Sequence, residues 1–212
     1  KYKYKYKYKY KYKYKYKYKY KYKYKYKYKY KYKYNINIIC YSNMKINIIV
    51  AIDNIMGIGK NNKLPWNISY DLKYFSKLTR GNGNNAIIMG RKTWESLPVK
   101  PLIKRENLIL SKTLNIDKFI NNTTVKSFDT IDNVLKFCNN KNYDSVWIIG
   151  GEKIYKQFIN NYERIIDNIY ITYIKECYDC DTFFPILKSC WKLKSIEKTE
   201  NEELYEYQIY SK

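Results

Sequence analysis

The chain has 212 residues, with 42 basic and 19 acidic side chains and no histidine. Seventeen of the lysines lie in a strict Lys-Tyr alternation over residues 1–34, so the remaining 178 residues carry 25 basic against 19 acidic side chains, a net charge of +6 rather than +23. The lack of histidine excludes Ser-His-Asp and Cys-His nucleophiles, histidine metal sites and imidazole acid–base chemistry. Proton transfer would therefore fall to a carboxylate, a tyrosine or water.

Residues 1–43 are predicted to form a low-complexity tract and linker, separate from a domain over residues 44–212. A positive charge at every second position and the lack of an apolar core predict that the tract is disordered. Two interpretations are open: a tether to nucleic acid with tyrosines stacking on bases, or a translated short nucleotide repeat ahead of a start at Met44. Neither a secretory nor a membrane-spanning pattern is present, so a cytoplasmic protein without a membrane partner is expected.

The odd number of cysteines, in a chain without an export signal, indicates reduced thiols. They are Cys40, Cys138, Cys177, Cys180 and Cys190. The Cys-x-x-Cys spacing of residues 177–180 does not support a metal site, because structural zinc needs four such ligands. No helix start follows the pair to lower a thiol pKa. The sequence therefore predicts no bound metal.

Beyond residue 44, short apolar runs alternate with amphipathic segments, which predicts a single α/β domain. Strands are expected over residues 46–52, 86–89, 107–110, 124–128, 146–149, 169–174, 191–196 and 205–210. Helices are expected over residues 70–79, 92–97, 130–138 and 152–160. Runs such as 86–89 lack polar alternation and predict central strands covered on both faces. The predicted fold is a central, mostly parallel sheet of about eight strands, with a C-terminal antiparallel edge hairpin and about four flanking helices.

The first predicted helix, opened by Ser69, carries an acidic residue on its apolar face. Asp71 lies in line with Phe75 and Leu78 at helical spacing. One interpretation is a first-turn charge after a Ser69 N-cap, which favours the helix dipole by about 0.3–1 kcal/mol. The other is a partly buried carboxylate at a pocket wall that pairs with a nitrogen-rich heterocycle. The helix alone does not decide between them.

Two strand-to-helix connections point to an anion. Gly150 and Gly151 precede a helix, so backbone N–H groups and a helix N-terminus form an anion cradle. Arg91 and Lys92 stand at another helix start, where cations oppose the dipole unless a multiply charged anion binds between them. Lys112 adds a third positive charge at the sheet edge where α/β proteins bind nucleotides. Without the usual dinucleotide fingerprint, these cations favour NADP over NAD.

Together these segments resemble dihydrofolate reductase, from about Met44 to the end of the chain. The resemblance rests on Ala51, Met56-Gly57-Ile58-Gly59, Leu64-Pro65-Trp66, Asp71-Leu72, Tyr74-Phe75, Ile88-Met89-Gly90-Arg91-Lys92-Thr93-Trp94-Glu95-Ser96, Arg105, Asn107-Leu108, Ile149-Gly150-Gly151, Tyr155, Tyr170, Thr172, Asp181-Thr182 and Phe184-Pro185. The resemblance to this family is specific because of the order and spacing of these pieces, not because of any single one. The resemblance implies reduction of dihydrofolate to tetrahydrofolate by hydride transfer from NADPH, and antifolate inhibitors as further ligands.

The resemblance also implies roles for residues of the substrate site. Asp71, with Trp66 and Thr172, would be catalytic: the carboxylate would hold the pterin and promote protonation of its ring nitrogen, and Thr172 would brace it. Arg105 would pair with the carboxylate of the folate tail. The implied substrate-binding residues are Ile49, Val50, Asp71, Phe75, Thr93, Leu97, Leu102, Arg105, Ile149 and Tyr155.

On the cofactor side, the resemblance implies that Gly150 and Gly151, joined by a cis peptide, cover the pyrophosphate, while Ala51 and Ile58 border the nicotinamide. Residues 57–64 would form a mobile loop that closes over the nicotinamide and excludes water. The implied cofactor-binding residues are Ala51, Ile58, Gly59, Gly90, Arg91, Lys92, Thr93, Leu110, Ser111, Lys112, Ile149, Gly150, Gly151, Glu152, Lys153, Ile154 and Tyr155.

The chain departs from the family pattern in two places. Asp71 stands where some relatives carry Glu, and residues 99–104 differ most from familiar members. Many protist and plant relatives are fused to thymidylate synthase, and this chain is expected to carry no such domain.

Two rival functions are open. One is a reductase of the same fold that acts on a ribosylamino-pyrimidine of riboflavin synthesis, against which Trp66, Asp71 and Arg105 stand at folate-site positions. The other is a nucleic-acid-binding protein driven by the Lys-Tyr tract, although no specific nucleic-acid partner is expected. A fall in NADPH absorbance on adding dihydrofolate would separate a reductase from a binder, whose affinity would fall steeply with salt.

Overall fold

The structure is a computed structural model that describes residues 44–114, 123–197, 199 and 203–212. The prediction of a disordered tract over residues 1–43 falls outside the described residues. So does Cys40. All structural statements below concern the described part of the chain.

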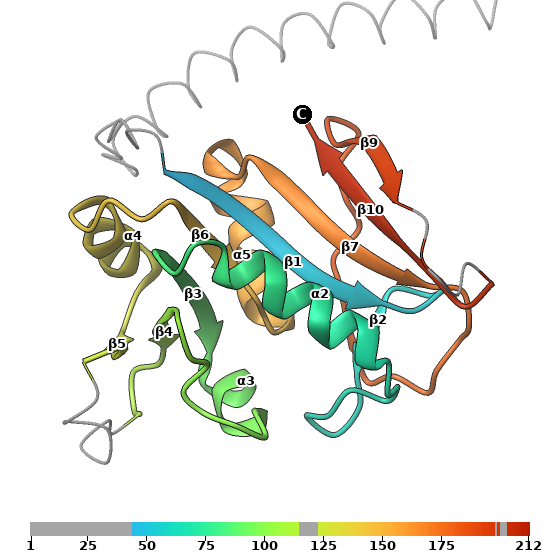
Figure 1. The fold of residues 1–212 in the computed structure, drawn as a ribbon, viewed down its shortest axis with the longest axis horizontal. Helices are drawn as coiled ribbons and strands as arrows, with labels where there is room; N and C mark the ends of the chain where they lie inside the picture. The colour runs from blue at the N-terminus through green and yellow to red at the C-terminus, as the bar shows by residue number, and fades with distance from the viewer. Residues whose placement is uncertain (1–43, 115–122, 198, 200–202) are drawn as a thin grey trace, which may run out of the picture. The chain divides into compact units, whose positions relative to one another are not determined.

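An eight-stranded sheet forms the centre of the domain, in the order β5-β4-β3-β6-β1-β7-β10-β9 (Figure 1). Its strands are β1 (Lys45–Ile52), β3 (Asn85–Gly90), β4 (Glu106–Leu110), β5 (Val125–Phe128), β6 (Ser145–Ile148), β7 (Asn168–Ile174), β9 (Lys192–Glu197) and β10 (Tyr205–Ser211). Neighbouring strands from β5 to β7 pair in parallel, whereas β10 runs antiparallel to both β7 and β9. The predicted parallel sheet and its antiparallel edge hairpin are confirmed.

The sequence analysis missed a second, two-stranded sheet made of β2 (Gly57–Gly59) and β8 (Thr182–Phe183). Strands of three and two residues are too short to show a period-2 pattern. Beside this pair, the carboxylate of Asp53 accepts hydrogen bonds from the amides of both Gly57, at 2.6 Å, and Tyr178, at 2.9 Å. This long-range bridge joins the loop after β1 to the loop before β8.

The four predicted α-helices are present as α2 (Ser69–Arg80), α3 (Arg91–Ser96), α4 (Ile131–Asn139) and α5 (Glu152–Asn161), and a 3₁₀ turn, η2 (Glu163–Ile165), follows α5. The predicted Ser69 N-cap is wrong. Ile68 occupies the N-cap without a side-chain hydrogen bond, and Ser69 is the first helical residue. Ile68 is buried in a cluster with Trp66, so core packing holds its extended backbone at this position. By contrast, Thr130 caps α4 through its side chain, which accepts the Asn133 amide at 3.2 Å.

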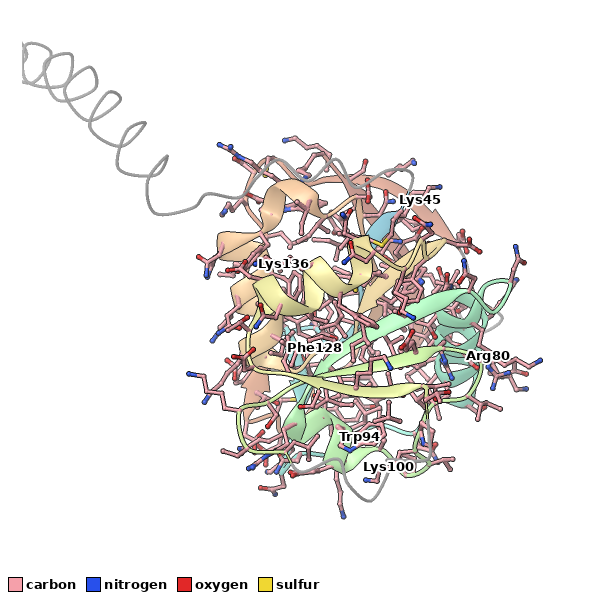
Figure 2. The ribbon with its side chains drawn as sticks, turned by 90° about the vertical axis from the view of Figure 1, so that its left-hand side faces the viewer. Lys45, Arg80, Trp94, Lys100, Phe128 and Lys136 are labelled. Carbon is pink, nitrogen blue, oxygen red and sulfur yellow. The ribbon has the colours of Figure 1, made fainter. Side chains whose placement is uncertain are left out.

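The helices form one layer on each face of the sheet. Ile48 of β1 packs in a core cluster with Val134 of α4 and Phe158 of α5. Ile49, on the opposite face, packs in a cluster with Trp94 of α3 and Phe75 of α2. Figure 2 shows the molecule from the side, with α4 at left and α2, ending at Arg80, at right.

This layering fixes where a site can form. Because β1, β3, β4 and β6 run in parallel, their C-terminal ends meet at one edge, where α3 and α5 begin. Within the described residues, no helix is long and apolar enough to cross a membrane.

Candidate active site

A buried carboxylate lies where α2 crosses the C-terminal half of β7. Asp71, in the first turn of α2, is only 8% exposed, and the Thr172 hydroxyl donates a hydrogen bond to its Oδ1 at 2.6 Å. Strand pairing sets Thr172 beside Ala51 of β1. Burial raises the pKa of Asp71, and the hydrogen bond from Thr172 partly opposes that shift. No Lys or Arg forms an ion pair with Asp71 within the described residues.

Tyr155 of α5 connects this carboxylate region to β1. Its hydroxyl donates to the carbonyl oxygen of Ile49 at 2.8 Å in a fully buried contact. Burial and the nearby charge of Asp71 raise the pKa of Tyr155, so the phenol stays neutral. Three candidates from different elements, Ile49, Tyr155 and Asp71, are therefore in one neighbourhood.

Trp66 contributes a buried donor. It packs edge-on against Tyr178, with ring centroids 5.4 Å apart, in a cluster that includes Ala51. Within the described part of the chain its indole Nε1 has no hydrogen-bond partner. A buried donor left unpaired costs about 1–3 kcal/mol, so an acceptor from a ligand or water suits this position.

A second charged group, Arg105, is buried at the other end of α2. It is 5% exposed, donates from Nη1 to the Thr79 hydroxyl at 2.6 Å and lies 5.8 Å from the centre of the Phe75 ring. Burial and the nearby charge of Arg80 lower the pKa of Arg105 to about 10. The described residues supply Arg105 with no carboxylate partner.

Apolar candidates surround these groups. Phe75, Leu97, Leu102 and Ile149 pack, partly buried, against the same core cluster that contains Ile49. Val50 is buried on the opposite face of β1, in the cluster beneath α4 and α5. The sheet thus separates Val50 from the apolar residues predicted to sandwich the substrate.

The glycine connections form a narrow backbone cradle. The expected cis peptide between Gly150 and Gly151 is present, and Gly150 has a φ of 103°. A Cβ on Gly150 would lie 2.7 Å from the Tyr155 ring, and one on Gly151 would lie 3.3 Å from the Thr93 hydroxyl. The Gly90 amide donates to the Gly150 carbonyl at 2.7 Å, which joins the ends of β3 and β6. Only glycine fits at this point, as a close-approaching phosphate would require.

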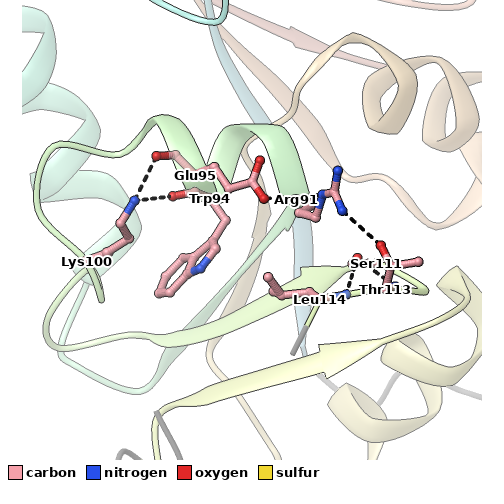
Figure 3. A network of polar contacts seen from close by, with 7 residues as sticks. All are labelled: Arg91, Trp94, Glu95, Lys100, Ser111, Thr113 and Leu114. Atoms are coloured by element: carbon pink, nitrogen blue, oxygen red, sulfur yellow. Dashed lines mark hydrogen bonds and ion pairs between the residues drawn. The ribbon is translucent and has the colours of Figure 1, made fainter. Parts of the chain in front are cut away.

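Arg91 faces the segment after β4 (Figure 3). Its Nη1 donates to the Thr113 hydroxyl at 2.9 Å and its Nε lies 3.3 Å from Glu95. The Ser111 hydroxyl accepts the Thr113 amide in turn, at 3.2 Å. The sequence analysis missed Lys100, whose ammonium group donates to the Trp94 and Glu95 carbonyls at the end of α3.

A pocket of about 730 Å³ opens beside the C-terminal end of β4. The predicted cofactor residues among its walls are Leu110, Ser111, Lys112, Lys153 and Ile154. The lining residues that the sequence analysis did not predict are Asp129, Thr130, Ile131, Asp132, Gln157, Asn161 and Tyr162. Asp129 follows β5, so the rule that ligands gather at strand ends could have found it. Arg91 and Lys92 do not line this pocket.

Ile58 and Gly59, predicted to border the cofactor, belong to β2. The Gly59 carbonyl accepts hydrogen bonds from the Thr182 hydroxyl and the Asp181 amide, each at 3.0 Å. The Asp53 carboxylate, which sequence reasoning missed, holds Gly57 at the start of the strand. The predicted closing loop is thus attached to β8 through its first residues.

Fold and site together define an α/β protein with a nucleotide-sized pocket at the carboxyl edge of its sheet and a buried carboxylate on α2. The sequence profile of the dihydrofolate reductase family matches residues 45–212, and the chain therefore belongs to the dihydrofolate reductase family. This enzyme family reduces dihydrofolate to tetrahydrofolate with a nicotinamide cofactor. The predicted family and fold class are confirmed.

Curated relatives support this assignment. The chain is 35% identical over 187 residues to dihydrofolate reductase of Heliothis virescens, in a match that covers 81% of this chain and 99% of that protein. It is 37% identical over 171 residues to dihydrofolate reductase of Staphylococcus haemolyticus, covering 80% of this chain and 95% of that protein. Bifunctional dihydrofolate reductase-thymidylate synthase 2 of Arabidopsis thaliana is 39% identical over 148 residues, covering 65% of this chain and 26% of that protein.

Substituting Asp71→Asn should raise the free energy of unfolding at pH 7–8. Burial raises the pKa of Asp71 in the folded state, so the wild-type free energy of unfolding falls as pH rises through that folded-state pKa. Below the ordinary aspartate pKa of about 3.9, Asp71 is protonated in both states, and wild type and variant should be equally stable. Urea unfolding of both proteins across pH measures this difference in the free energy of unfolding. Asp132→Asn, in the exposed first turn of α4, is the control and should lose about 0.3–1 kcal/mol through the helix dipole. A similar loss for Asp71→Asn would support the dipole interpretation instead.

Gly150→Ala should destabilise the protein more than Gly83→Ala. Both glycines have positive φ, so alanine at either costs about 1–3 kcal/mol in backbone strain. A Cβ at Gly83 meets nothing within 4 Å, whereas one at Gly150 displaces the buried Tyr155 ring. Urea midpoints of the two variants give the comparison, and equal losses would show that the cradle is not tightly packed.

Proposed function

We propose that this chain catalyses NADPH-dependent reduction of 7,8-dihydrofolate to 5,6,7,8-tetrahydrofolate, with protonation of the pterin assisted by Asp71. When bound, NADPH supplies the hydride. The observation that carries the proposal is the Asp71–Thr172 pair, a carboxylate that is buried with one hydrogen-bond donor and no cation among the described residues. A heterocycle with an amino group and a ring N–H provides the donors that this carboxylate needs.

Asp71 would both orient and assist protonation. Thr172 donates to Oδ1, which fixes the carboxylate plane and leaves Oδ2 for the pterin. The raised pKa supports this role, because a group whose pKa moves toward the working pH exchanges protons more readily. The unpaired indole N–H of Trp66 would help to hold a water or pterin oxygen beside it.

The rest of the substrate would lie along the α2 face of the sheet. Ile49 and Ile149 would wall the pterin, and Phe75 and Leu97 would enclose the rings that follow. Arg105, buried without a carboxylate among the described residues, would bind the tail carboxylate of dihydrofolate. Antifolate inhibitors would compete for the same groups. Leu102 and Thr93 complete the proposed substrate set, and Val50, whose side chain lies on the opposite face of the sheet, would take part only through its backbone.

The cofactor would follow the sheet edge. The backbone at Gly150 and Gly151, where a Cβ would clash or crowd, suits a pyrophosphate at the start of α5. Lys112 and Lys153 line the adjoining pocket and support a phosphorylated adenosine there, hence NADPH. Arg91 and Lys92 begin α3 and would flank the phosphates nearer Gly90. Ala51 and Ile58 would border the nicotinamide, with the loop over residues 57–64 closing on it.

A cytoplasmic location accompanies this proposal. Cys138, Cys177, Cys180 and Cys190 all carry free thiols, which suits a reducing compartment.

Asp71→Asn should lower the rate of hydride transfer to dihydrofolate about 10²–10⁴-fold at neutral pH, because general acid–base assistance is lost. NADPH affinity should stay nearly unchanged, and activity should partly recover in acid, where solvent protonates the substrate. Pre-steady-state NADPH absorbance across pH measures both effects. Asp144→Asn, an exposed carboxylate remote from the site, is the control. A wild-type rate in Asp71→Asn would remove Asp71 from the mechanism.

A further inference from the structure

The 730 Å³ pocket beside β4 carries charges of both signs. Lys112 and Lys153 line it, and so do two carboxylates, Asp129 and Asp132. Under the proposed function, on which this inference rests, the pocket receives the adenosine end of the cofactor. The two lysines favour a 2′-phosphate, whereas the carboxylates oppose it. The balance between them decides which nicotinamide cofactor binds.

The two carboxylates differ in position: Asp129 directly follows β5, whereas Asp132 lies within α4. Asp132 Oδ1 accepts the Tyr162 hydroxyl at 2.8 Å. Asp129 Oδ1 accepts the side-chain amide of Asn133 at 2.7 Å, and no ion pair engages either carboxylate in the described ranges. The hydrogen bond from Asn133 and the charge of Lys112 lower the pKa of Asp129, so it is ionised at neutral pH.

Asp129 also occupies the strand end where an anion would otherwise bind well. It follows β5 directly, and Thr130, the next residue, caps α4. The N-terminus of α4 carries a partial positive charge, but Asp129 and Asp132 already offset it. A 2′-phosphate entering here would add negative charge beside a fixed carboxylate. A ribose 2′-hydroxyl would instead donate to that carboxylate, as acidic residues accept the ribose in NAD-binding folds.

We propose that Asp129 is a specificity-determining residue that weakens the preference for NADPH, so that NADH binds and is oxidised as well. Lys112 and Lys153 keep NADPH acceptable, and Asp129 makes the unphosphorylated cofactor competitive. Arg91 and Lys92 do not line the pocket, so their proposed contacts with the phosphates are separate from the effect of Asp129. For a doubly charged phosphate near one carboxylate in a solvent-exposed site, the effect is on the order of three- to tenfold in affinity.

The test compares dissociation constants of NADPH and NADH, measured by isothermal titration calorimetry at low salt, for wild type and three variants. Asp129→Asn keeps the size and the acceptor for Asn133 but removes the charge, and it should tighten NADPH about three- to tenfold relative to NADH. Lys112→Gln should shift the ratio the other way. Asp144→Asn, whose carboxylate also accepts an asparagine amide and lies outside the pocket, is the matched control and should leave the ratio unchanged.

An unchanged ratio in Asp129→Asn, or a shift equal to that of Asp144→Asn, would overturn the proposal. Dihydrofolate-dependent oxidation of NADPH and of NADH by wild type is measured in parallel. If wild type oxidises neither cofactor, the proposed function itself fails. If it oxidises NADPH and the Asp129→Asn ratio is unchanged, only the role of Asp129 fails.

Discussion

The hydrogen bond from Thr172 to Asp71 is the constraint on which the site depends. It joins the first turn of α2 to β7, and β7 pairs with β1, so one carboxylate sets the position of a helix against two central strands. A helix start with an ionised carboxylate toward the sheet is unfavourable unless that charge is used. Under the proposed function, a nitrogen-rich substrate would supply the missing donors. This charge is a cost to stability that substrate binding would then relieve.

The parallel strand order determines where the proposed cofactor site lies. The parallel order of β4, β3, β6 and β1 brings the strand ends, the glycine cradle and the lysine-bearing pocket to one edge. The hydrogen bond from the Tyr155 hydroxyl to the Ile49 carbonyl joins α5 to β1. The helix that begins at the glycine cradle therefore also contacts the strand that would line the substrate site. Tyr155 therefore contacts both Gly150 and Ile49, and under the proposed function a change in the cradle would also affect the pterin site.

Much of this was readable from the sequence, for identifiable reasons. The uninterrupted apolar run before Gly90 identified a central strand, Gly150-Gly151 identified a tight strand-to-helix turn, and Asp71 stood out as a charge on an apolar helix face. Long-range geometry was not readable. The pairing of β2 with β8 and the hydrogen bond from Tyr178 to Asp53 join segments more than 100 residues apart, and buried Ile68 occupies the N-cap expected for Ser69. Asp129 could have been found from its position directly after a predicted strand, whereas Gln157, Asn161 and Tyr162 line the pocket through the packing of α5, which no local motif signals.

The central claim is that Asp71 is a buried carboxylate whose charge is unfavourable in the free protein. Carbon-13 NMR of protein labelled at the aspartate carboxyl groups, titrated with pH and with Asp71→Asn as the assignment control, measures this directly. The account predicts that Asp71 titrates above the ordinary aspartate pKa of about 3.9. A pKa at or below that value would contradict it, because Asp71 would then be stabilised in its charged form, as a helix-start residue is.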